Sequence, residues 1–283
     1  ISLLANLLEN PVYVEGSAAL STEEALARFR EAAVPQLRYQ LIYPSYPYQI
    51  EGDPQVRLLY QVTTPAFIDA VTGEFVNFTG QAVLDSPAEA VPAGSEPQRA
   101  VSFPLAPGDA VAVVRDLLGL PEDAEIQILD LSDDTGREAS YHLYWHDEEG
   151  SASVSLNGKT GLVEYAYRSV PVSQNAPDPG QAEPTEEQLA QAREEAIRVV
   201  QRHFGSLVPS LRLEPGVTLL VSGEGISFHF QRYEHGVPFS HDGVDVITDP
   251  ATGQWTRINA YWQEGVDLAP PEGVIGPRLR WKH

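Results

Sequence analysis

Residues 244–262 read VDVITDPATGQWTRINAYW, and the turn at the centre of this stretch decides the fold. Asp249, Thr252 and Gly253 form an Asp-x-x-Thr-Gly pattern between two runs of β-branched and aromatic residues. An Asp side chain in such a turn accepts hydrogen bonds from backbone amides further along, and glycine supplies the positive φ that closes a short loop. The stretch therefore predicts a β-hairpin with strands at 244–247 and 255–262.

The same pattern occurs twice more in the chain. The sequence DAVTG begins at Asp69 and NGKTG begins at Asn157, so the three copies lie 88 and 92 residues apart. Internal similarity at a nearly constant spacing indicates repeated supersecondary units. We therefore expect three related units, each ending in this hairpin.

A helical pattern precedes each copy. Ser21 and Thr185 are followed three residues later by Glu24 and Gln188, which is the capping-box signature of a helix start. The other helix begins near Pro107. The residues expected to end the three helices are, in chain order, Pro35, Gly119 and Gly205.

Strand-like runs lie between these helices and the hairpins. The expected strands are 37–43 and 56–62; 125–131, 140–146, 151–156 and 162–168; and 217–222, 226–233, 244–247 and 255–262. A helix followed by antiparallel strands predicts an α+β fold built of tandem units, each with a helix packed on an antiparallel β-sheet.

Composition shifts predict the domain boundaries. The expected parts are a first unit at 1–84 with an N-terminal extension, a linker at 85–104, a second unit at 105–169, a linker at 170–184, a third unit at 185–263 and a tail at 264–283. Both linkers are rich in proline and polar or small residues, so we expect irregular surface connections there.

The composition excludes several classes of protein. The 283 residues include 40 Asp and Glu against 18 Lys and Arg, for a net charge of −22, which argues against nucleic-acid binding. No apolar run reaches the roughly 18–20 residues that span a membrane. Without cysteine there is neither a disulfide nor a thiolate site. The absence of Met, with Ile at position 1, predicts a piece of a longer protein, and the acidity with 23 Pro and 22 Gly fits an exported or wall-associated one.

Several of these stretches resemble a known family. The third unit carries FHFQRYEHGVPF from Phe228, VDVI from Val244, the turn at Asp249 and a closing Trp262. These residues look like the repeated domain of the bacterial YcdB/YcdC-like proteins, and the helix–strands–hairpin order resembles the PepSY-type domain. The first unit is similar, with LYQV followed by FIDAVTGE from Phe67. The second unit departs from the pattern, because it has Asn157 in place of Asp and lacks an Arg-x-x-x-Gly-x-Pro segment.

The resemblance implies exported, often surface-anchored proteins of unassigned activity. The wider PepSY group is associated with propeptides and with holding peptidases in check. It has no shared catalytic residues, so the resemblance assigns none to this chain.

Arg232, Gly236 and Pro238 form the most specific local motif. One interpretation is a recognition loop between two strands. The other is a plain turn, in which Gly236 supplies backbone freedom and Pro238 opens the next strand. The residues themselves favour the turn.

Histidine pairs and acidic runs are weak metal candidates. His142 and His146 lie in a predicted strand, where four residues span about 13 Å, too far to share a zinc ion. His235 and His241 flank a short turn, and we expect no metal there either. The run from Asp130 to Asp134 lacks the Gly and Glu of a calcium loop, which leaves weak calcium binding open.

Three further features carry little chemistry. The Tyr-Pro segment at 43–48 offers either a peptide- or glycan-binding strip or a loop whose rings pack back on the first unit. The basic residues at 278–283 either dock on an acidic face or mark where a longer protein continues. The acidic clusters at 122–123 and 147–149 indicate solvated loops.

No nucleophile elbow, phosphate loop or dinucleotide fingerprint is present in the sequence. We therefore predict no catalytic, cofactor-binding or metal-binding residues, and we expect that the protein is not an enzyme. The expected function is an extracellular or cell-wall-associated interaction module whose partner is a peptidase or a cell-wall protein. The alternatives are a rigid spacer of a surface protein and a hydrolase with an unrecognised carboxylate site.

Overall fold

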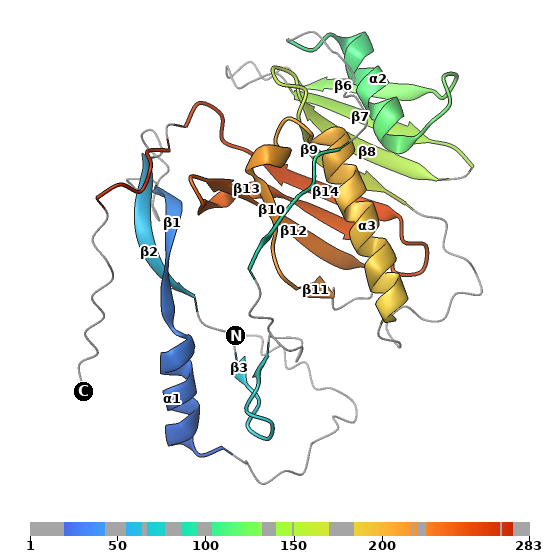
Figure 1. Ribbon diagram of the computed structural model, residues 1–283. Helices are drawn as coiled ribbons and strands as arrows, with labels where there is room; N and C mark the ends of the chain where they lie inside the picture. The colour runs from blue at the N-terminus through green and yellow to red at the C-terminus, as the bar shows by residue number, and fades with distance from the viewer. Residues whose placement is uncertain are drawn as a thin grey trace, which may run out of the picture. The chain divides into compact units, whose positions relative to one another are not determined.

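The computed structural model describes residues 20–42, 55–63, 67–76, 87–94, 104–131, 140–148, 150–169, 184–216, 218–219, 225–266 and 268–273 (Figure 1). The chain divides into two compact units, Ile1–Gln36 with Val62–Val83, and Leu37–Gln61 with Leu84–His283. The smaller unit contains α1 (Thr22–Ala32) and the short hairpin of β3 (Phe67–Ile68) and β4 (Phe75–Val76).

Helix α1 begins as predicted, with the capping box of Ser21 and Glu24. None of its own residues is buried. It meets the hairpin through an edge-to-face contact of Phe29 with Phe75, whose ring centroids lie 5.8 Å apart, and through Arg28, which donates to the carbonyl oxygen of Gly73.

The three predicted turns have the same hydrogen bonds. In each, the Asp or Asn carboxyl or amide oxygen accepts from the amides two and three residues on, at 2.6–3.2 Å. The glycine amide donates to the backbone oxygen of the same Asp or Asn at 2.7–2.8 Å. The glycine φ angles are 74°, 70° and 67° at Gly73, Gly161 and Gly253. The repeated pattern in the sequence is therefore confirmed as a repeated turn.

The larger unit is built around one sheet, which has twelve strands among the described residues. Its main path runs in the order β5 (Glu89–Ala90), β10 (Leu211–Leu213), β12 (Ile226–Glu234), β13 (Val237–Thr248), β14 (Trp255–Tyr261), β9 (Val163–Arg168), β8 (Ser151–Asn157), β7 (Ser140–His146) and β6 (Ile126–Leu131). Every neighbouring pair on this path is antiparallel.

The remaining strands branch from this path. β11 (Thr218–Leu219) pairs with β12, and β1 (Val34–Ile42) pairs with β2 (Gln55–Thr63). β1 also meets β13 in parallel, where Tyr39 lies opposite Phe239. A small second core surrounds this point, and the hydroxyl of Tyr39 donates to the carbonyl of Ala269 at 2.7 Å.

One cross-strand row of apolar residues defines the core face of the sheet. Its members, each paired with the next, are Ile128, Leu143, Val154, Ala166, Ile258, Val246 and Phe228. All of them except Ile128 are at most 1% exposed. Because directly paired residues share a face of the sheet, this row holds seven strands around a single core.

Helices α2 (Pro107–Leu118) and α3 (Glu186–His203) contribute their buried residues to that same core. Both helices lie over one face of the sheet (Figure 1). Gly119 ends α2 in the left-handed conformation, as predicted. The predicted capping box of Thr185 and Gln188 starts α3, which ends at His203 before the short 3-10 helix η1 (Val208–Ser210). The predicted α+β class is confirmed.

Two segments differ from the prediction. β13 begins at Val237 rather than at Val244, because the chain across Pro238 and Asp242 is held extended by buried contacts. Within the expected linker at 85–104, residues 89–90 pair with β10 and Val91 is 8% exposed, so this part is more regular than its composition predicted.

The division into three tandem units, with the boundaries given above, stays a prediction. The calcium-like segment 132–134, the Tyr-Pro segment 43–48 and the basic residues 278–283 lie outside the described residues.

Candidate functional site

The motif selected from the sequence is a tight turn with a buried arginine beside it. His235 and Gly236 join β12 to β13 with φ angles of 51° and 77°, and Pro238 is the second residue of β13. The plain-turn interpretation of Gly236 and Pro238 is confirmed. Arg232 belongs to β12 and is 8% exposed, so it is no part of a surface loop.

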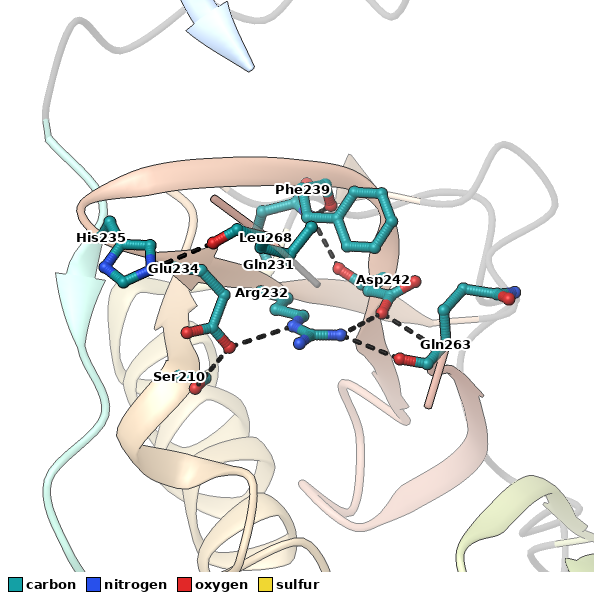
Figure 2. A network of polar contacts seen from close by, with 9 residues as sticks. All are labelled: Ser210, Gln231, Arg232, Glu234, His235, Phe239, Asp242, Gln263 and Leu268. Carbon is teal, nitrogen blue, oxygen red and sulfur yellow. Dashed lines mark hydrogen bonds and ion pairs between the residues drawn. The ribbon is translucent and has the colours of Figure 1, made fainter. Parts of the chain in front are cut away.

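Arg232 forms an ion pair with Asp242, a residue that the sequence analysis missed (Figure 2). Arg232 Nη1 lies 2.8 Å from Asp242 Oδ2, and the two side chains are 10% and 0% exposed. The backbone of Gln263 completes the pair, since its amide donates to Asp242 Oδ2 at 2.9 Å and its carbonyl accepts from Arg232 Nη1 at 3.1 Å. Burial raises the pKa of the Asp242 carboxyl, and the hydrogen bonds from Gln263 and Arg232 oppose that rise.

The rest of the guanidinium is also in contact. It stacks 4.4 Å from the ring centroid of Trp262, and Arg232 Nε donates to Glu234 at 3.2 Å. The neighbouring Gln231 amide donates to the carbonyls of Phe239 and Asp242. The cluster therefore ties β12, β13 and the segment after β14 together. The other carboxyl oxygen of Asp242, Oδ1, is buried without a hydrogen-bond partner in the described part of the chain.

The face of the sheet opposite the core row carries exposed tyrosines. Alternation along each strand places on it the paired rows Leu129–His142–Ser155–Tyr165–Asn259 and Gln127–Tyr144–Ser153–Tyr167–Arg257. We call these ten residues, with Tyr261, the tyrosine face. Leu129 and Tyr261 are each 60% exposed, and Tyr144, Tyr165 and Tyr167 are 38–41% exposed. Isolated exposed apolar residues are ordinary on protein surfaces, but here five exposed apolar or aromatic side chains lie on one face of the sheet.

The two histidine pairs considered as metal candidates lie apart from any larger group of ligands, since among the described residues no three or more His, Cys, Asp or Glu gather where they could hold a metal ion. His142 lies on the tyrosine face, and the ring of His146 stacks on Tyr144 with a centroid distance of 6.4 Å. His235 contacts the carbonyl of Leu268, whereas His241 contacts Gln40. The two members of that second pair therefore have different partners.

His229 lies on the side of the sheet that carries the tyrosine face. It pairs with Asp245 across β12 and β13, at 2.6 Å between Nδ1 and Oδ1. Burial lowers the pKa of His229, but the hydrogen bond and the charge of Asp245 outweigh burial, so the pKa lies above its usual value.

A hollow of about 450 Å³ opens on the side of the sheet that the helices cover, between α2 and α3. Arg115, Arg168, Arg198, Arg202 and His203 line it together with Asp116 and Trp255. The sequence analysis missed this group, since its members are spread from Arg115 to Trp255 and no motif connects them. Asp242, the carboxyl group whose pKa is raised by burial, does not line this hollow; the carboxylate that does, Asp116, is paired with Arg202.

His203 predicts a pH dependence of stability. Burial lowers its pKa from 6.5 to about 4, with Asp116 opposing and Arg202 and Arg198 adding to the shift. The unfolded chain takes up the proton near pH 6.5, the folded chain only near pH 4, so stability falls as the pH drops through this window. The loss amounts to about 3 kcal/mol at pH 4.

Urea unfolding at pH 7 and at pH 4 measures this loss in the wild type and in His203→Gln, which cannot titrate. We expect the difference between the two pH values to be smaller in the variant by that amount. Equal pH dependence in both proteins would contradict the assignment.

A family model described as "YcdB, YcdC repeated domain" matches residues 110–262, which run from the first turn of α2 to the residue after β14. Among solved structures, the chain is similar to the Bacillus megaterium YpeB C-terminal domain, with 18% identity and a TM-score of 0.44. That match covers 55% of this chain and 63% of the other, less than two thirds of its length. No curated protein matches the chain. Among the described residues, no helix is long and apolar enough to cross a membrane.

Proposed function

Because the chain belongs to the family of the YcdB, YcdC repeated domain, we propose that it is a non-catalytic interaction module that binds an extended segment of a partner protein. The partner is a peptidase that the module restrains, or a protein of the cell wall, and the module acts outside the cell or in the wall. The acidic composition, rich in proline and glycine, supports this location.

The observation that carries the proposal is the tyrosine face. Tyr165 and Tyr167 stand two residues apart on β9, with serines of β8 beside them in both rows. In one row Ser153 lies between Tyr144 and Tyr167, so a small side chain separates two aromatic rings; we call this part of the tyrosine face the strip. Tyrosine combines a large apolar ring with a polar tip at little entropic cost, which explains its enrichment in protein interfaces.

The strip lies close to an edge of the sheet. β6 ends the strand order, and among the described residues it pairs with β7 alone. The open edge of a strand can receive an extended peptide through backbone hydrogen bonds, while pockets for alternate side chains give specificity. Leu129 of β6 is 60% exposed and stands where the side chains of such a peptide would rest. The net charge of −22 favours a basic partner segment.

The test compares two double variants that remove equally exposed side chains. Tyr165→Ala/Tyr167→Ala removes two rings of the tyrosine face, which are each 38% exposed. Leu59→Ala/Tyr60→Ala is the matched control, because these residues of β2 are 41% and 40% exposed and lie on another strand pair. Each protein serves as bait for the secreted and cell-wall fractions of the source organism. The peptidase activity of the retained material is then assayed with and without added wild-type protein.

We expect the wild type and the control to retain the partner and to inhibit a retained peptidase. Loss of two aromatic anchors should weaken binding at least about tenfold. Equal retention by Tyr165→Ala/Tyr167→Ala would contradict binding through this face. A retained peptidase whose activity does not change would leave binding in place and contradict restraint.

A further inference from the structure

The hollow between α2 and α3 concentrates positive charge in a strongly acidic protein. Two arginines come from successive turns of α3, Arg198 and Arg202, while Arg115 belongs to α2 and Arg168 ends β9. A second hollow of about 490 Å³ shares Arg168 and Arg198 with the first, and the turn at Thr252 and Gly253 lines it. The two hollows therefore adjoin at these two arginines on the helix side of the sheet, and Glu194 and Glu195 also line the second one. We call the two hollows together the arginine-lined depression.

Two of the four guanidinium groups are matched by carboxylates. Arg202 Nη2 lies 2.8 Å from Asp116 Oδ1. Arg198 binds Glu195 through two nitrogens, each at 2.8 Å. These contacts hold the two side chains in place and neutralise their charge.

The other two guanidinium groups have no carboxylate partner among the described residues. Arg168 Nε donates to the backbone oxygen of Trp255 at 2.5 Å, and the guanidinium lies 4.3 Å from the centroid of the indole ring. Arg115 Nη2 donates to the carbonyl of Ala124 at 3.3 Å, whereas its Nε is buried without a hydrogen-bond partner in the described part of the chain. Both side chains are thus fixed through neutral groups, and neither guanidinium has an ion-pair partner among the described residues, although the charge of Glu195 acts on Arg168.

Fixed and unmatched guanidinium groups are suited to an oxyanion. Their planar donors fit carboxylate and phosphate oxygens two at a time, and stacking on Trp255 holds Arg168 rigid before a ligand arrives. Burial lowers the pKa of Arg168, with Arg198 adding to that effect and Glu195 opposing it. An anion placed there would relieve this unfavourable burial of charge, whereas the remaining surface of a chain with a net charge of −22 repels anions.

We propose that this depression binds one small oxyanion that carries two negative charges, either a phosphate group or a pair of carboxylates. Arg115 and Arg168 are its principal donors, and Arg198 and Arg202 shape the rim. The site lies on the opposite side of the sheet from the tyrosine face, so it stands independently of the proposed function.

The experiment titrates the full chain by calorimetry with inorganic phosphate and, separately, with succinate, at constant ionic strength set by sodium chloride. We expect one saturable site per chain for at least one of the two anions. Arg168→Met and Arg115→Met should each weaken that binding at least about tenfold, the loss typical of a charge-assisted hydrogen-bond pair. Tighter binding of phosphate identifies the phosphate group, and equal or tighter binding of succinate identifies the dicarboxylate.

Two controls keep the result interpretable. Arg193→Met also removes one positive charge from α3, but Arg193 lines neither hollow and pairs with Glu89. The affinity of this variant for the anion should therefore equal that of the wild type. Arg198→Met covers the case in which Arg168→Met fails to fold, because the Arg198 side chain is 56% exposed. Its loss should still weaken binding, since Glu195 would then carry an unpaired negative charge beside the anion. No saturable binding of either anion overturns the proposal, as does binding that both Arg115→Met and Arg198→Met leave unchanged.

Discussion

Replacing Arg232 with Met should lower the free energy of unfolding by about 3–5 kcal/mol, the usual cost of removing one partner of a buried ion pair. The reason is Asp242, whose side chain is 0% exposed and would keep its charge without a guanidinium beside it. Methionine retains most of the volume of arginine, so the loss reports charge rather than a cavity. Urea unfolding at pH 7 measures it.

Two further measurements separate this explanation from a general loss of packing. In Arg232→Met/Asp242→Asn the buried charge is gone and an amide oxygen remains for the Gln263 amide, so the double variant should recover a large part of the loss. In the single variant the pKa of Asp242 should rise further, and the penalty should shrink as the pH falls and the carboxyl takes up its proton. A double variant as unstable as the single one would contradict the ion-pair explanation.

Replacing Phe228 with Ala should cost about 3–5 kcal/mol as well, for a different reason. Phe228 is 1% exposed and ends the apolar row that crosses seven strands under the two helices. Removing its ring leaves a cavity that the flanking strands, held by backbone pairing on both sides, cannot close.

The matched control is Tyr261→Ala in β14 of the same sheet. Tyr261 is 60% exposed, so its truncation should change the free energy of unfolding by less than about 1 kcal/mol. Chemical unfolding of both variants measures the contrast. A similar small loss in Phe228→Ala would mean that the row does not form the principal core of the larger unit.

The features that the sequence predicted well are local ones. The turn at Asp249 depends on a side chain that bonds amides two and three residues away, and the helix start at Thr185 depends on Gln188 three residues on. Such contacts are complete within five residues, so their residue pattern is legible without knowledge of the fold. The same holds for the Gly119 cap.

The length of β13 could not be predicted from neighbouring residues alone. Pro238 and Gly243 disfavour a strand by composition, yet both lie within it. A methyl group at Gly243 would stand 2.6 Å from the backbone oxygen of Phe230, so glycine is needed there by the close approach of β12. The contact between two strands, rather than the preference of the residue, sets this segment.

By itself, the amino-acid sequence determined the repeated hairpin, the helix caps, the α+β class and the family, because each rests on residues close together in the chain. Only the tertiary structure decided which side chains share a site. It paired Arg232 with Asp242, collected Arg115, Arg168, Arg198 and Arg202 around one hollow, and set the tyrosines of β7, β9 and β14 on one face. These groupings arise from strand register and helix packing, which bring together residues whose separation in the chain leaves no periodic signal.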